Sequence, residues 1–182
     1  MTKETPYQMV ERFHQVFKST RIPEKPTAFT DQHAINRAAF KIEEIVEMVA
    51  ATSEGDPDQL KQSVQYLHQA LDQAEKKIVG KKQYGKNPLI EQVDALTDLL
   101  YFTYGSFSLL GVDPTSIFEI VHQANMGKLF PDGQPHYDAI TKKILKPENW
   151  QTDYAPEGKI AKEIDRQTQV AKTRKKSVSK QK

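Results

Sequence analysis

The sequence predicts an all-α protein, in which a helical bundle is followed by an irregular C-terminal segment that wraps over it. Apolar residues recur at intervals of three and four along most of the chain, as expected for amphipathic helices. No run alternates convincingly at the period of two that is typical of a half-buried strand. Five or six helices joined by short connections are typical of a bundle.

Two helices are predicted in the first third of the chain. The first spans residues 5–18, and a proline-containing link over residues 21–29 follows it. Thr30 or Asp31 can cap the second helix, because short side chains with an oxygen accept hydrogen bonds from the first backbone N–H groups. This helix is expected to end near Thr52, where a Ser-Glu-Gly sequence follows.

The third predicted helix has start and stop signals at its two ends. Asp56 can cap it, Pro57 suits its first position, and Gly80 suits its C-terminal exit. Its apolar residues follow one another at spacings of four and three, which predicts a seam that packs against another helix. These residues are Leu60, Val64, Leu67, Leu71, Ala74 and Ile78.

Two further helices are predicted over residues 87–111 and 113–128, each opened by a residue pair that ends in proline. Pro, Gly and Asp then recur, which indicates irregular chain. We expect one principal domain over residues 1–155, a C-terminal helix over residues 156–171 and a disordered basic tail over residues 172–182.

The charges of the chain are unevenly distributed. There are 26 Lys and Arg residues against 24 Asp and Glu residues, for a net charge of +2. Six basic residues and no acidic ones lie in the tail, so the rest of the chain carries a net charge of −4. Because no aromatic residues alternate with the basic residues of the tail, we expect no specific nucleic-acid partner.

Several classes of protein are excluded by composition. The chain contains no cysteine, which excludes a disulfide framework, thiol catalysis and a thiolate metal site. Its first residues are charged where a signal peptide needs an apolar core, and no apolar stretch reaches the roughly 18 residues of a membrane span. We therefore expect a cytoplasmic protein without a membrane partner.

Carboxylates gather on one side of the second predicted helix. Glu43, Glu44 and Glu47 fall within about 100° of one another, opposite an apolar face. A solvated helix face is the simpler interpretation. Three like charges on one face nevertheless repel one another, which favours a cation as their partner.

The fourth predicted helix is apolar almost all round, which is typical of a helix buried on most sides. Glu91, Asp94 and Asp98 nevertheless fall within about 60° of one another on this helix. Buried carboxylates are usually paired or bound to a metal, and ordinary caps and ion pairs are the alternative. Two acidic stripes that face each other offer only oxygen ligands, which favours Mg²⁺ or Mn²⁺ and a phosphorylated substrate.

These carboxylates belong to motifs that resemble a known superfamily. A Glu-Glu-x-x-Glu motif at residues 43–47 is followed on a later helix by an acidic pair that ends in Asp-Leu-Leu-Tyr at residues 98–101. The stretches at residues 121–129, 132–133 and 146–150 strengthen the likeness. Together they resemble the all-α nucleoside triphosphate pyrophosphohydrolases of the MazG and phosphoribosyl-ATP pyrophosphohydrolase superfamily, in particular the MazG-like dUTP-hydrolysing branch.

The resemblance implies a MazG-like helical bundle that cleaves a nucleoside triphosphate between its α- and β-phosphates, releasing a monophosphate and pyrophosphate. It implies that Glu44 and Glu47 bind metal and that Glu43 is a further ligand or the general base, with Glu43 and Glu47 as the catalytic candidates. Asp98 matches the aspartate of the second motif. Two registers remain open for the acidic pair, namely Asp94 with Asp98 or Glu91 with Asp94. A homodimer or a dimer of dimers is also implied.

Three residues are candidates for contacts with substrate phosphates. Asn125 and Lys128 lie three positions apart near the end of the fifth helix, where they could instead terminate the helix and complement its dipole. Lys146 is a further candidate. Trp150, the single tryptophan, is expected to be a packing anchor rather than a platform for a base.

Two other classes of function compete with this interpretation. A di-iron carboxylate bundle needs Glu-x-x-His motifs, which occur at residues 11–14 and 119–122. We expect Glu119 and His122 to point away from the apolar face of their helix, which argues against iron. A non-enzymatic helical interaction module, built on the seam of the third helix and on the basic tail, is the second alternative.

Overall fold

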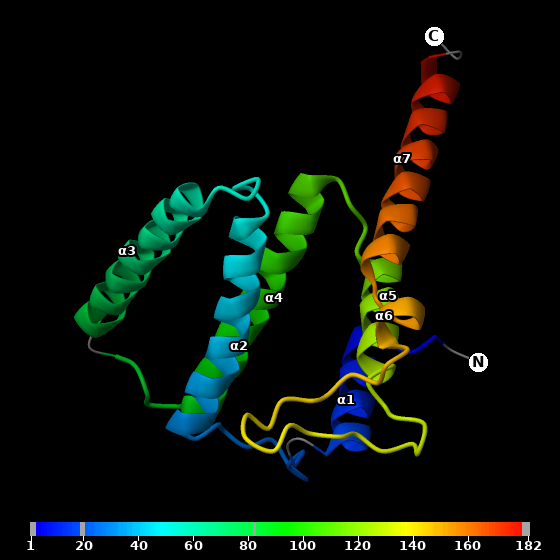
Figure 1. The fold of residues 1–182 in the computed structure, drawn as a ribbon. Helices are drawn as coiled ribbons and strands as arrows, with labels where there is room; N and C mark the ends of the chain where they lie inside the picture. Colours follow the sequence, from blue (N-terminus) through cyan, green and yellow to red (C-terminus); the bar gives the residue numbers. More distant parts are fainter. Residues whose placement is uncertain (1–2, 19–20, 82, 180–182) are drawn as a thin grey trace. The chain divides into compact units, whose positions relative to one another are not determined.

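The computed structural model describes residues 3–18, 21–81 and 83–179, with side chains described up to residue 174. The all-α fold class is confirmed, since β pairing among the described residues is limited to two isolated bridges, Leu129–Pro135 and Tyr137–Ile144. The elements shown in Figure 1 are α1 (Pro6–Phe17), α2 (Asp31–Ala50), α3 (Pro57–Lys81), α4 (Pro88–Leu110), α5 (Thr115–Met126), α6 (Trp150–Asp153) and α7 (Glu157–Ser179). The chain divides into two compact units, unit 1 (residues 1–24 and 100–182) and unit 2 (residues 25–99).

The predicted helix starts are confirmed, and each has a local cause. The hydroxyl of Thr5 accepts a hydrogen bond of 3.3 Å from the backbone N–H of Gln8, and the Gln8 side chain accepts one of 2.9 Å from the N–H of Thr5. Thr30 caps α2 in the same way, accepting from the N–H of His33 at 3.3 Å. These bonds satisfy backbone donors that the first turn of a helix leaves without partners.

Two helices extend beyond their predicted ends. Helix α3 continues through Gly80 to Lys81, because glycine favours an exit but costs only about 1 kcal/mol inside a helix. Helix α7 passes Ala171 and continues to Ser179, although the composition of residues 172–182 predicts a disordered tail. Its last turns contain neither Gly nor Pro, so no residue in them terminates the helix. Residues 180–182 of the predicted tail lie outside the described residues.

Unit 1 has its core where α5 packs against α1 and α7. Phe17 is fully buried and stacks on Phe13 with ring centroids 4.3 Å apart. The hydroxyl of Tyr137 donates a hydrogen bond to the carbonyl of Phe17, so the irregular segment after α5 is attached to the end of α1. The buried apolar residues are Met9, Phe17, Ile117, Ala124 and Trp150.

His122 lies in the contact between α1 and α5. It is only 7% exposed, although helical periodicity places it away from the apolar face of α5. The physical reason is that α5 is covered on more than one side, so its buried surface is wider than its apolar stripe. Arg12 donates a hydrogen bond of 2.9 Å to Nε2 of His122 and another of 2.9 Å to Glu4.

This contact predicts that the protein loses stability in mild acid. Burial, and then the Arg12 guanidinium, lower the pKa of His122 from its ordinary value of 6.5. The unfolded chain therefore binds this proton more readily than the folded one, so stability falls as the pH decreases below about 6.5. The melting temperature should be lower at about pH 5.5 than at about pH 7.5, a range above the titration of ordinary carboxylates. His122→Gln, which keeps an acceptor for Arg12, should remove most of this difference. A wild-type melting temperature that is equal at both pH values would contradict the prediction.

Unit 2 contains a helical hairpin, in which α2 and α3 pack against each other near the turn that joins them. Ser53 in this turn is buried, and Leu60, Val64 and Leu67 of α3 are half-buried. Farther from the turn, Leu71 is 61% exposed and Ile78 is 44% exposed. The two helices therefore diverge along their length, as Figure 1 shows. The predicted seam of α3 is covered only in its first half.

Helix α4 runs from unit 2, which ends at residue 99, into unit 1, which resumes at residue 100, and it exposes many large apolar side chains. None of its residues is buried, although its sequence is apolar over most of its length. Phe102 is 68% exposed, Leu110 73%, Tyr101 76% and Leu109 92%. The prediction that this helix is buried on most sides therefore does not hold within one described chain. Among the described helices, none combines the length and the apolar character that crossing a membrane requires.

Candidate functional site

The three glutamates of α2 lie in unit 2, on the second half of the helix. Glu43, Glu44 and Glu47 are exposed, whereas Val46 and Val49 are half-buried near the turn into α3. At about 100° per residue, the three carboxylates project to a different side of α2 from Val49. The acidic stripe predicted on this helix is therefore accessible to a ligand from solvent.

The three acidic residues of α4 also lie in unit 2, but they differ in their contacts. Asp94 and Asp98 are exposed, whereas Glu91 is partly buried against the loop that precedes α4. One carboxylate oxygen of Glu91 accepts a hydrogen bond of 2.7 Å from the N–H of Gly85, and the other accepts one of 3.0 Å from the N–H of Asn87. These backbone hydrogen bonds lower the pKa of Glu91. Glu91 therefore holds the start of α4, which matches the alternative of an ordinary cap.

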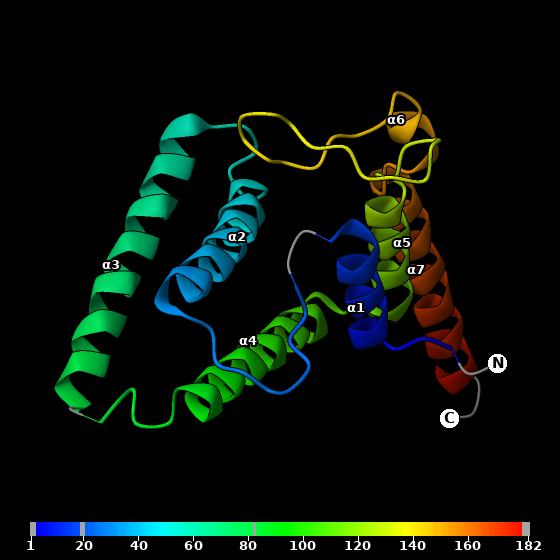
Figure 2. The same ribbon diagram turned by 90° about the horizontal axis from the view of Figure 1, so that it is seen from below.

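The acidic stripes of α2 and α4 do not meet along their lengths in the described residues. The start of α4 is attached to the entry of α2, since Gln92 accepts a hydrogen bond of 2.8 Å from the N–H of Phe29 and donates one of 3.2 Å to its carbonyl. Beyond this point α2 and the first half of α4 do not pack closely, and Figure 2 shows their ribbons apart. No group of three or more acidic or histidine side chains in the described part of the chain is close enough to hold a metal ion.

The acidic side chains of α2 and α4 are nevertheless the type of ligand that a hard cation prefers. All six residues offer carboxylate oxygens, without nitrogen or sulfur donors among them, and such oxygens are the ligands that Mg²⁺ prefers. Five of them are exposed, so a cation would not have to displace packed side chains. Glu91 is the exception, because both of its oxygens already accept backbone hydrogen bonds. Asp94 with Asp98 is therefore the more accessible of the two registers.

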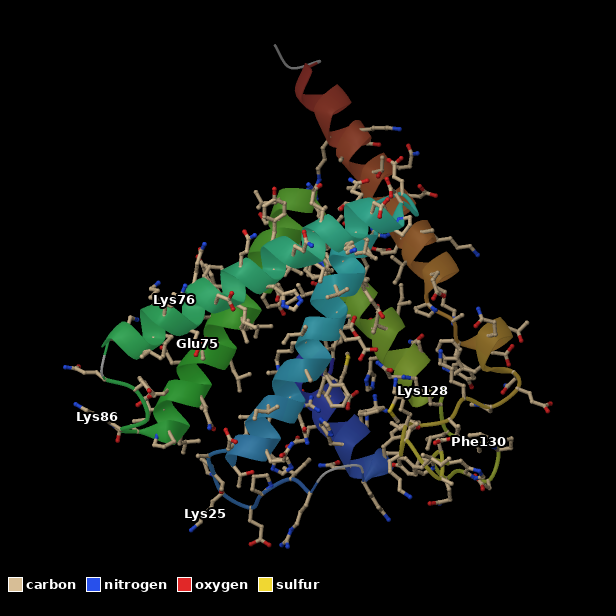
Figure 3. The ribbon with its side chains drawn as sticks, turned by 60° about the vertical axis from the view of Figure 1, so that its left-hand side comes forward. Lys25, Glu75, Lys76, Lys86, Lys128 and Phe130 are labelled. Atoms are coloured by element: carbon tan, nitrogen blue, oxygen red, sulfur yellow. The ribbon has the colours of Figure 1, made fainter. Side chains whose placement is uncertain are left out.

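The predicted phosphate-binding residues lie in unit 1. Nζ of Lys128 donates a hydrogen bond of 2.7 Å to the side-chain oxygen of Asn125, and both residues are half-buried. Figure 3 shows Lys128 on the segment that leaves α5, with Phe130 farther along it. The structure therefore brings Asn125 and Lys128 together as one cationic group at the end of α5.

Lys146 lies on the irregular segment and contacts Trp150. Its Nζ atom is 3.7 Å from the centroid of the Trp150 ring, a cation–π contact. The indole N–H of Trp150 donates a hydrogen bond of 2.8 Å to the carbonyl of Ala124 in α5. Trp150 is therefore a packing anchor, as expected, and it also connects the segment of Lys146 to the end of α5.

Two residues of this region were not singled out from the sequence. Tyr154 packs directly on Gly127, where a Cβ atom would lie 2.2 Å from Cγ of the tyrosine. A shallow cavity of about 320 Å³ borders this contact, lined by Gln123, Met126, Gly127, Asp153, Tyr154 and Lys159. The signal available in the sequence was the spacing of four residues between Trp150 and Tyr154, which places two aromatic rings on one side of a helical turn.

The di-iron alternative is not supported by the contacts of its histidine motif in α5. Nε2 of His122 accepts a hydrogen bond from Arg12, and Glu119 forms an ion pair of 2.5 Å with Lys3. A guanidinium beside the imidazole would repel a metal cation. The two residues of this motif in α5 therefore form contacts with α1 and with the segment that precedes it.

Comparisons with known proteins agree with this fold. Residues 10–125 match the phosphoribosyl-ATP pyrophosphohydrolase family. A crystal structure of a protein from Exiguobacterium sp. 255-15, proposed to be an NTP pyrophosphohydrolase, is similar with a TM-score of 0.83 and 37% sequence identity. The similarity covers 93% of this chain and 99% of that one. Among curated proteins there is no match.

The fold and the comparisons define the class as an all-α hydrolase of the pyrophosphohydrolase type. The chain belongs to the phosphoribosyl-ATP pyrophosphohydrolase family. The matched residues include all of α2, α3, α4 and the acidic residues on them.

Proposed function

We propose that this protein hydrolyses nucleoside triphosphates to nucleoside monophosphates and pyrophosphate, with Mg²⁺ as its cofactor and Mn²⁺ as a possible substitute. The observation that supports this most directly is the set of six carboxylates on two helices of unit 2, in a chain of the pyrophosphohydrolase family. Glu43, Glu44 and Glu47 with Asp94 and Asp98 would hold the cation. When bound, Mg²⁺ polarises phosphoryl oxygens and neutralises their charge.

The chain's own residues supply a proton acceptor and a site for the leaving group. In the proposed reaction a water oxygen forms a bond to the α-phosphorus, and the bond from this phosphorus to the α,β-bridging oxygen breaks. Glu43 or Glu47 accepts the proton of the water. Asn125, Lys128 and Lys146 bind the phosphates that leave as pyrophosphate, because a cation stabilises the negative charge that accumulates there.

A second copy of the chain is the proposed partner. Large apolar patches on a soluble protein mark interfaces, and α4 exposes a row of aromatic and aliphatic side chains. The uncovered second half of the α3 seam adds Leu71 and Ile78. We propose that these faces pair in a homodimer or a dimer of dimers, whose assembly also brings carboxylates of α2 and α4 within reach of one cation. The cellular role that fits this chemistry is removal of unwanted nucleotides from the cytoplasmic pool.

The proposed reaction is tested by incubating the purified full chain with a panel of NTPs and dNTPs and analysing the products by ³¹P NMR. Equal amounts of monophosphate and pyrophosphate are expected with Mg²⁺, and the rate should fall to background with EDTA. Release of orthophosphate would indicate another bond specificity and would contradict the proposal. If no nucleotide is hydrolysed with either metal, a helical interaction module that uses Leu71 and Ile78 becomes the better interpretation.

A further inference from the structure

Trp150 contacts both segments that carry the predicted phosphate-binding residues. Its side chain is buried, with 7% of the residue exposed. Its indole N–H donates to the carbonyl of Ala124, the residue before Asn125, at 2.8 Å. The Nζ atom of Lys146 lies over the face of its ring, 3.7 Å from the ring centroid. The single tryptophan of the chain therefore lies between Asn125 and Lys146.

The hydrogen bond from Trp150 has a specific place in the last turn of α5. A helix leaves its last four carbonyl groups without partners inside the helix. Three of them accept bonds from the backbone that follows, namely Gln123 from Gly127 at 2.8 Å, Asn125 from Lys128 at 3.2 Å and Met126 from Leu129 at 3.1 Å. The remaining one, Ala124, accepts from Trp150. The indole therefore completes the hydrogen bonding of the turn that carries Asn125.

Tyr154 fixes the same turn at a second point. An added Cβ at Gly127 would lie 2.2 Å from Cγ and 2.8 Å from Cβ of Tyr154. Both distances are too short for two carbon atoms that are not bonded to each other. The φ angle of Gly127 is −65°, an ordinary value for any residue. Glycine is therefore required here by the approach of the Tyr154 ring and not by the backbone conformation.

We propose that Trp150 and Tyr154 are positioning residues of the enzyme. By fixing the end of α5 at Ala124 and Gly127, they hold Asn125 and Lys128 in one preformed arrangement that binds the pyrophosphate part of the substrate. Trp150 holds Lys146 on its ring face for the same ligand. This inference rests on the proposed function, because it assigns the leaving pyrophosphate to these three residues. A site held in advance binds more tightly, since fewer side chains have to be ordered when the ligand arrives.

The first test measures pyrophosphate binding to the full chain by isothermal titration calorimetry. Trp150→Phe keeps an aromatic ring for Lys146 but removes the N–H donor. We expect its dissociation constant for pyrophosphate to rise about five-fold, the effect of one typical hydrogen bond. Its KM for the triphosphate should rise similarly while kcat changes little, because the carboxylates of unit 2 are unaltered. Ile117→Val, a core substitution in the same helix at a residue 8% exposed, is the matched control and should leave the dissociation constant unchanged.

The second test uses the contact between Gly127 and Tyr154. Gly127→Ala should weaken pyrophosphate binding, because its methyl group displaces the Tyr154 ring. Tyr154→Ala removes the collision, so the double variant should bind pyrophosphate as Tyr154→Ala alone does. Thermal melts monitor folding, and Tyr154→Ala keeps the test available if Trp150→Phe does not fold.

Indole fluorescence adds a direct signal, since Trp150 is the only tryptophan. Pyrophosphate should change its emission in the wild type and should not do so in Lys128→Ala. Wild-type pyrophosphate affinity in both Trp150→Phe and Tyr154→Ala would overturn the positioning role. So would an absence of pyrophosphate binding in a wild-type enzyme that hydrolyses NTPs. A wild type that binds pyrophosphate through Lys128 but hydrolyses no nucleotide would instead refute the proposed function and leave the positioning role standing.

Discussion

Glu47→Ala is expected to lower kcat/KM for nucleoside triphosphates by about 10²–10⁴-fold, the range that a positioned proton acceptor contributes. Asp98→Asn should cause a comparable loss, because an amide cannot supply the negative charge that holds a divalent cation. Both side chains are exposed in unit 2, so the helical content should remain unchanged. Steady-state assays of pyrophosphate release, with circular dichroism on the same samples, measure both quantities.

Glu75→Ala provides the matched control for this prediction. Glu75 is an exposed glutamate on α3 (Figure 3), in the same unit, and it belongs to neither acidic stripe. Its replacement removes the same charge and should leave kcat/KM within about two-fold of the wild type, as expected for a surface residue. Full activity of Glu47→Ala or Asp98→Asn would show that these carboxylates are not part of the reaction. A comparable loss in Glu75→Ala would mean that the effect is one of net charge.

Leu109→Asp is expected to dissociate the assembled protein. Leu109 is 92% exposed in a single chain, on a helix most of whose other large apolar residues are also exposed. Burial of one leucine contributes about 1.5–3 kcal/mol, and a symmetric dimer buries two, so the dissociation constant should rise by at least about 10²-fold. Sedimentation equilibrium over a range of protein concentrations measures the change.

Ile140→Asp is the control for this experiment. Ile140 is 91% exposed, so the substitution adds the same charge at an equally accessible apolar residue, but on the irregular segment and not on α4. It should leave the association constant unchanged. A wild-type chain that is monomeric at micromolar concentration, or a Leu109→Asp variant that associates normally, would show that this face of α4 is not the interface.

The helices were predictable because their signals are local. Thr30 begins α2, and Pro57 and Pro88 open α3 and α4 as expected. The C-terminal ends of the helices were less predictable, because a residue such as glycine only favours a helix end and does not enforce one. Gly80 permits an exit from α3 without enforcing one, and nothing in the sequence after Ala171 enforces one either. Burial was the least predictable property, because the apolar stripe of α5 does not reveal that His122 contacts Arg12 of another helix.

The candidate site was predictable as a set of residues but not as a set of contacts. Helical periodicity places Glu43, Glu44 and Glu47 on one side of α2 without any knowledge of neighbouring helices. It does not reveal that Glu91 binds the backbone of the preceding loop, because that contact depends on the loop conformation at Gly85. Likewise, the pairing of Asn125 with Lys128 follows from their spacing, whereas the contact of Trp150 with Ala124 joins residues far apart in the chain.

The contact between Gly127 and Tyr154 has a consequence for how this sequence can diverge. Because the tyrosine ring occupies the space of a side chain at position 127, a mutation of the glycine is tolerated only after the aromatic residue has become smaller. A smaller residue at position 154 leaves space for a side chain at position 127, so glycine is then no longer required there. Substitutions at positions 127 and 154 are therefore coupled, and the substitution at position 154 has to come first.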